Sequence, residues 1–323
     1  MARIKKKTTV TKSKAPKVQK SKDGARLKKL THKQKKTVLK TQQRQKQLVS
    51  SWRLIKASSK HLWKYKKLFI GISLIYGLFY VLLVKGLTSN FQLETLRANL
   101  EENTGSVVSG LGGGLTLYGL LLGSANTGTS EVSGVYQLFL FIIGSLAVIR
   151  ALRLTYAEKL PSVKESFYTS TDQFIPFLIV FFFVLLQLMP ALFGTGFYNI
   201  LIENGIASNG IQQFAAAVVM VGGIMLSLYY LSSTVLALYI VTLGGTMPRD
   251  ATKIARGLVR YRRKKIIFKM LFLPLFLLLL SGLALVPLIM FVPVAAEITF
   301  LVGGIFVLAY AHSYYYALYR SLI

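Results

Sequence analysis

The amino-acid sequence predicts an all-α, polytopic helical membrane protein with six transmembrane helices, cytoplasmic interfacial amphipathic helices and a disordered basic N-terminal tail. Of its 323 residues 53% are hydrophobic, and six apolar segments are each long enough to cross a bilayer. The formal net charge of +29 is concentrated at the start, because residues 1–67 hold 24 of the 40 Lys and Arg residues. This combination excludes an ordinary soluble enzyme, and the lack of cysteine excludes disulfides and thiolate metal sites.

The N-terminal tail, residues 1–50, is expected to be cytoplasmic and disordered, since its first half has almost nothing to bury. Its charge favours binding to anionic membrane lipids, and contact with RNA or the ribosome is the alternative. The cations expected to bind a polyanion lie in the tail and in one later loop: Lys5, Lys6, Lys7, Lys28, Lys29, Lys35, Lys36, Arg260, Arg262, Arg263, Lys264 and Lys265.

The membrane domain, residues 51–323, contains the six predicted spans. They cover approximately residues 68–87, 134–152, 174–193, 215–240, 266–291 and 294–318. A tight turn around Pro293 joins the last two spans into a helical hairpin. The uncharged, Gly-rich segment 103–130 is a seventh candidate, but its glycines disfavour a helix by about 1 kcal/mol each.

The positive-inside rule favours six spans over seven. With six spans and the tail inside, 38 of the 40 Lys and Arg residues are cytoplasmic, whereas a seventh span would move 14 of these 38 outside. We therefore expect both termini on the cytoplasmic side of a bacterial-type inner membrane. The Gly-rich segment is then an outer element, external or interfacial, with re-entrant and spanning arrangements as the alternatives.

Similar polar segments precede every second span, at residues 51–68, 156–174 and 249–266. They suggest three units, each an interfacial helix followed by a membrane hairpin, although any two spans with basic flanks look somewhat alike. We expect these helices to lie along the cytoplasmic surface with their apolar faces toward lipid. Asp250, which closely follows Pro248, is expected to cap the third of them.

The third of these segments and the span after it read PRDATKIARGLVRYRRKKIIFKMLFLPLFLLLL. With its Ala-rich short helix, Arg262-Arg263 and Pro274, this string resembles poorly characterised bacterial membrane proteins related to the membrane domain of glycerophosphodiester phosphodiesterases. The resemblance covers roughly residues 50–320 and implies an integral membrane role without catalytic residues in this part. The soluble phosphodiesterase domain is absent, and the Lys-rich tail departs from the family pattern.

The sequence contains no motif for catalysis, metal binding or phosphate binding. We therefore expect that the protein is not an enzyme and that it binds neither a cofactor nor a metal. The polar candidates within the bilayer are Glu297, Gln187 and His312. Glu297 either reaches the outer water or lines a cavity with Gln187. His312 lies among tyrosines and belongs either to an interfacial aromatic belt or to a ligand or proton site.

The predicted role is a scaffold or lipid-associated accessory protein whose basic tail binds anionic lipid or another cytoplasmic polyanion. A small-solute or lipid transporter with a site near Glu297 is one alternative, and a membrane tether for the ribosome or nucleic acid is another. The oligomeric state stays open.

Overall fold

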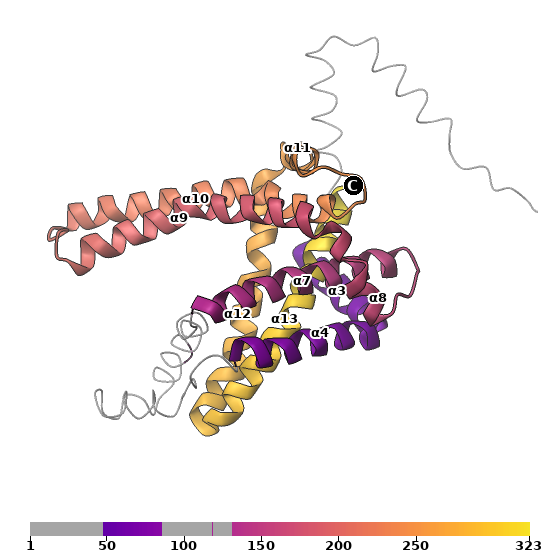
Figure 1. The fold of residues 1–323 in the computed structure, drawn as a ribbon. Helices are drawn as coiled ribbons and strands as arrows, with labels where there is room; N and C mark the ends of the chain where they lie inside the picture. Colours follow the sequence, from indigo (N-terminus) through magenta and orange to yellow (C-terminus); the bar gives the residue numbers. More distant parts are fainter. Residues whose placement is uncertain (1–47, 86–117, 119–130) are drawn as a thin grey trace, which may run out of the picture. The chain divides into compact units, whose positions relative to one another are not determined.

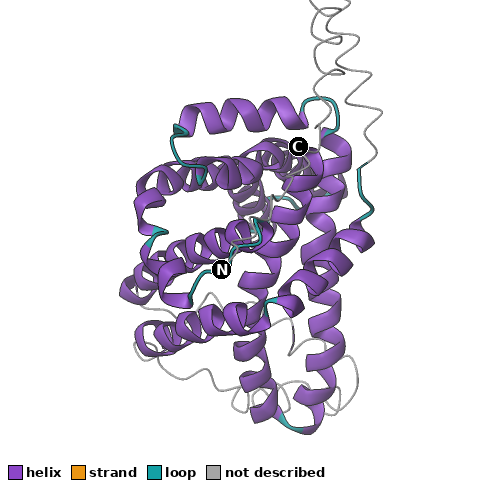
Figure 2. Cartoon of the chain, turned by 90° about the vertical axis from the view of Figure 1, so that its right-hand side faces the viewer, coloured by secondary structure: helices purple, strands orange, loops and turns teal. Residues whose placement is uncertain are grey.

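The computed structural model describes residues 48–85, 118 and 131–323, and all regular structure among them is helical (Figures 1 and 2). The elements are α3 (Ser51–Lys64), α4 (Lys66–Tyr80) with the π-helical turn η1 (Val81–Lys85), α7 (Glu131–Tyr156), α8 (Val163–Tyr168), the 3-10 turn η3 (Thr171–Gln173), α9 (Phe174–Glu203), α10 (Gly210–Val241), α11 (Pro248–Val259), α12 (Arg263–Phe291) and α13 (Pro293–Leu322). Six of the described helices are long and apolar enough to cross a membrane, which confirms the predicted fold class.

The long helices pair in the order of the chain, as α4 with α7, α9 with α10, and α12 with α13. The α9–α10 hairpin (Figure 1) extends beyond the predicted spans, since α9 contains Pro190 and continues to Glu203. Gly205 turns the chain with a φ of +65°, a conformation that glycine adopts without steric cost. Asn209 and Gln212 then start α10 with a capping box.

Each hairpin is preceded by a short helix, as the three-unit pattern predicts: α3 before α4, α8 before α9, and α11 before α12. Each short helix packs on a hairpin of another unit. Helix α8 contacts α7 and α4, α11 contacts α10 and α9, and α3 contacts α13. The contact between α3 and α13 joins the first helix of the first unit to the last helix of the third unit. Whether the three units are related repeats stays a prediction.

The apolar faces of these short helices are turned toward protein, which differs from the expected contact with lipid. In α3 the buried residues are Leu54, Ile55 and Ser58, and the first two pack in one cluster with Leu273 and Leu318. In α11 the buried residues are Ala251, Ala255 and Val259. The small side chains bring α11 close to α10, so the amphipathic pattern of α11 is used mainly for packing between helices.

Only Tyr118 is described in the Gly-rich segment. Its hydroxyl donates to the carbonyl of Leu278 at 3.0 Å and lies 2.5 Å from Oγ of Ser281. Both partners are near the middle of α12, and Tyr118 is buried there with Leu285 and Ile289. The rest of the segment lies outside the described residues, so its predicted external position stays a prediction.

Candidate functional site

A row of lysines runs along the exposed side of α3. Lys56, Lys60 and Lys64 are four residues apart and all exposed, and Trp52 continues the same row one turn earlier. Trp63 lies beside the row with 74% of its surface exposed, and Nζ of Lys66 is 5.0 Å from the centre of its ring. Helix α3 contains no acidic residue, so nothing within the helix neutralises these cations.

The cations between α11 and the start of α12 differ in how far they are exposed. Arg260, Lys264 and Lys265 are exposed, and we call them, together with Lys56, Lys60 and Lys64, the basic end. The starts of α3 and α12 are linked, because Nζ of Lys269 donates to the carbonyl of Val49 at 2.6 Å.

Two arginines of the same loop are partly buried. The guanidinium of Arg263 lies 3.8 Å from the ring of Tyr229 in α10 and donates to its carbonyl at 3.0 Å. Nη2 of Arg262 is buried without a hydrogen-bond partner among the described residues. Arg263 therefore has a packing role that the sequence does not indicate. The tail lysines, Lys5 to Lys36, lie outside the described residues, so their predicted role stays a prediction.

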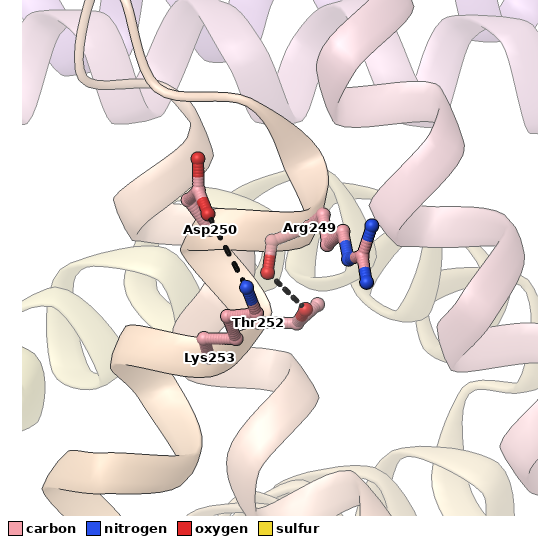
Figure 3. Close-up of polar contacts among 4 residues, drawn as sticks. All are labelled: Arg249, Asp250, Thr252 and Lys253. Carbon is pink, nitrogen blue, oxygen red and sulfur yellow. Dashed lines mark hydrogen bonds and ion pairs between the residues drawn. The ribbon is translucent and has the colours of Figure 1, made fainter.

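The first turn of α11 is fixed locally (Figure 3). The carboxylate of Asp250 is 4.0 Å from Nζ of Lys253, and the hydroxyl of Thr252 donates to the carbonyl of Arg249 at 2.8 Å. The N-cap residue is Met247 and Pro248 is the first residue of the helix, so the prediction that Asp250 caps the helix is wrong. Asp250 still lies in the first turn, where the helix dipole favours a negative charge.

The predicted intramembrane residues lie on two hairpins, with Gln187 on α9 and both Glu297 and His312 on α13. Gln187 is in α9, and its side-chain oxygen is buried without a partner in the described part of the chain. Glu297 is partly buried near the start of α13. A cavity shared by these two residues stays a prediction. His312 packs against α10, where its Nδ1 is 3.0 Å from the hydroxyl of Tyr239.

A small pocket lies where α7, α9 and α10 meet at the ends nearest α8. It is partly open to solvent and is lined by one apolar residue and six polar ones: Leu146, Arg150, Arg153, Thr169, Ser170, Gln173 and Thr242. No lining residue is acidic. The sequence does not indicate this pocket, because most of the polar residues that line it with Arg150 come from two other segments of the chain.

Comparison with known proteins adds no relative. No protein-family model, curated protein or solved structure matches the chain. The resemblance to the phosphodiesterase-linked membrane domain therefore rests on the sequence motifs alone, and function has to be argued from the geometry.

His61 joins three helices at the end where α3 lies. Its ring is stacked on Tyr156 of α7 with centroids 3.8 Å apart, and the guanidinium of Arg320 in α13 lies 4.3 Å from the same tyrosine ring. Nε2 of His61 is 2.9 Å from Oγ1 of Thr155, whose hydroxyl donates to the carbonyl of Ala151. The hydroxyl thus accepts from His61, which requires the imidazole tautomer with a proton on Nε2.

Protonation of His61 is expected to destabilise the protein below neutral pH. Burial, and then the nearby charges of Lys64 and Arg320, lower the pKa of His61 to about 4. The unfolded chain binds this proton near pH 6.5, so the stabilisation is complete above that pH and is lost as the pH falls toward 4. Since His61 is partly exposed, we expect a loss of only about 1–2 kcal/mol. Thermal unfolding at pH 7.5 and 4.5 tests this, and His61→Phe should show a smaller difference than the wild type. Equal differences in both proteins would contradict the prediction.

Proposed function

We propose that the protein is a non-enzymatic integral membrane protein that gathers anionic lipid at its cytoplasmic side. The observation that carries the proposal is the row formed by Trp52, Lys56, Lys60 and Lys64 on α3. Like charges four residues apart disfavour a helix by about 0.2–0.5 kcal/mol per pair. An anionic membrane surface reverses that effect, since it attracts each lysine by about 1 kcal/mol.

The aromatic residues beside the row indicate that the negatively charged partner of the lysines is a membrane surface. Trp52 and Trp63 are 51% and 74% exposed, and tryptophan is enriched at the level of the lipid headgroups. Lipid would lie against the exposed apolar side chains of the long helices and present its phosphates to the basic end. The tail, with its many lysines, adds to the same attraction under this proposal.

Replacing the row is expected to reduce the local enrichment of anionic lipid. The full chain is reconstituted into vesicles of phosphatidylglycerol and phosphatidylcholine and extracted with its surrounding lipid in polymer nanodiscs. The co-extracted lipid is then compared with the bulk mixture. Lys56→Gln/Lys60→Gln/Lys64→Gln should lower the enrichment several-fold at low salt, because ~1 kcal/mol per lysine corresponds to about fivefold in affinity.

Glu203→Gln is the matched control, because Glu203 is exposed at the opposite end of the α9–α10 hairpin. It should leave the enrichment unchanged. An unenriched lipid shell around the wild-type chain would overturn the proposal.

We also propose that the basic end and both termini face the cytoplasm, supported by the asymmetric distribution of Lys and Arg. Because the chain has no cysteine, Arg260→Cys introduces a single thiol. In intact cells this thiol should be protected from a membrane-impermeant maleimide and should react after the membrane is opened. Labelling in intact cells would contradict the orientation.

A further inference from the structure

The pocket between α7, α9 and α10 contains two arginines and no carboxylate. Arg150 and Arg153 are three residues apart and share one side of α7, and Nε of each is buried without a hydrogen-bond partner among the described residues. A guanidinium stays charged in proteins, so the two side chains repel each other and cannot become neutral. A bound anion would remove this repulsion.

The two arginines are not equivalent. The Nη atoms of Arg153 donate to the carbonyl and the hydroxyl of Thr242, the latter at 2.6 Å. Thr242 is the C-cap of α10, where a cation is favourable because the last carbonyls of the helix are otherwise unpaired. The described part of the chain offers Arg150 neither a hydrogen bond nor an ion pair. The uncompensated charge of the pocket is therefore chiefly that of Arg150.

The free groups of the pocket are hydrogen-bond donors. All three lining hydroxyls already donate to main-chain carbonyls: Thr169 to Glu165, Ser170 to Phe167 and Thr242 to Tyr239. The guanidinium of Arg150, Nε of Arg153 and the amide group of Gln173 remain. Gln173 is also the N-cap of α9, and the start of a helix carries a positive partial charge. A ligand that fits this pocket has to be an anion that accepts several hydrogen bonds.

Size and position narrow the class of anion. The pocket is far smaller than the approximately 300–1,000 Å³ of pockets for drug-sized ligands, so it can take no more than one small group such as a phosphate and excludes a nucleotide. Arg150 and Arg153 lie in the last two turns of α7, whose residues Ser133–Tyr156 are apolar enough to cross a membrane, and thus at the depth expected for lipid headgroups. Arginine also binds phosphate with two parallel hydrogen bonds.

We propose that this pocket binds one phosphate group per chain, supplied by the headgroup of a phospholipid or by free phosphate. For the lipid source, the inference rests on the proposed function. The site differs from the basic end in being a defined pocket for a single phosphate, whereas the lysine row attracts lipid diffusely. Arg150 binds the phosphate, and Arg153 positions it between α7 and the end of α10.

Two probes distinguish the sources of the phosphate. The full chain in detergent is titrated with phosphatidylglycerol, and native mass spectrometry counts the lipids that each chain retains. In parallel, the Tm is measured with inorganic phosphate and with chloride at equal ionic strength. Arg150→Gln is compared with the wild type and with Arg53→Gln, which removes an exposed arginine of α3 outside the pocket.

With a lipid source, one phosphatidylglycerol stays on the wild type and on Arg53→Gln, and Arg150→Gln binds it about 10–100-fold more weakly, as expected for losing a charged hydrogen-bonding group. With free phosphate, inorganic phosphate raises the Tm of the wild type but not of Arg150→Gln. Without either probe, Arg150→Gln should melt at the same temperature as the wild type or higher, because it removes an uncompensated charge. A lower Tm would show a purely structural arginine and overturn the proposal.

Equal responses of the wild type and Arg150→Gln to both probes would also overturn it. The lysine-row variant separates the two proposals. It should lose the diffuse enrichment of anionic lipid and keep the single retained phosphate. A third outcome is also possible: Arg150→Gln keeps the diffuse enrichment of anionic lipid, and the wild type retains no single tightly bound lipid. This outcome would refute phosphate binding in the pocket and leave the proposed function standing.

Discussion

Replacing Tyr239 with alanine is expected to lower the free energy of unfolding by about 3–5 kcal/mol, the usual cost of removing a buried aromatic side chain. Tyr239 is 2% exposed at the end of α10. Its ring lies 5.9 Å from that of His312, 6.1 Å from that of Tyr316 and 6.3 Å from that of Tyr319, all on α13. The side chain thus joins the α9–α10 hairpin to the last helix, and alanine leaves a cavity at this junction.

Two further variants divide this effect into its parts. Tyr239→Phe keeps the ring and removes only the hydroxyl that lies 3.0 Å from Nδ1 of His312, so it should cost about 1 kcal/mol. Tyr230→Ala removes a tyrosine of the same helix that is 44% exposed, and it should cost far less than Tyr239→Ala. Thermal and denaturant unfolding in detergent measure all three. Equal losses for Tyr230→Ala and Tyr239→Ala would contradict the role of Tyr239.

The spans could be predicted from the sequence because their requirement is local. A bilayer demands about 20 apolar residues in a row, and segments such as 174–193 satisfy this without reference to the rest of the chain. The predicted span 174–193 includes Pro190 but stops short of the end of α9 at Glu203. In the structure the helix continues, and the backbone N–H of Ala191 donates to Oγ of Ser227 in α10 at 3.0 Å. Whether a neighbouring helix offers such an acceptor is not visible in the sequence.

The partners of the short helices could not be predicted for the same reason. A period of 3.6 residues shows that α3 has an apolar face but not what that face contacts. Leu54 and Ile55 pack near Leu318, more than 260 positions later in the chain. The pocket could not be predicted either, because Arg150 and Gln173 come together only when α7 and the start of α9 pack in the folded chain. The sequence shows the tyrosines that neighbour His312 along the chain, whereas its hydrogen-bond partner, Tyr239, lies on another helix.

Among the described glycines, Gly223 in the α9–α10 hairpin should be the most sensitive to an added methyl group. A Cβ at this position would lie 2.3 Å from the carbonyl oxygen of Pro190, a backbone atom that cannot rotate away. A Cβ on Gly194 would lie 3.1 Å from Cα of Met220 on the facing helix. The two backbones therefore touch through their glycines, which is how transmembrane helices achieve close packing without a hydrophobic driving force.

Gly223→Ala is expected to destabilise the protein by about 1–3 kcal/mol, and Gly223→Leu by more, because each forces the helices apart and strains the bond between Ala191 and Ser227. The neighbouring glycine provides a control of opposite sign. A Cβ on Gly222 meets nothing within 4 Å, so Gly222→Ala should stabilise α10 by up to about 1 kcal/mol through its better helix propensity. Thermal unfolding in detergent compares the two variants. If both alanine variants shift the Tm in the same direction, the close contact at Pro190 does not hold the hairpin together.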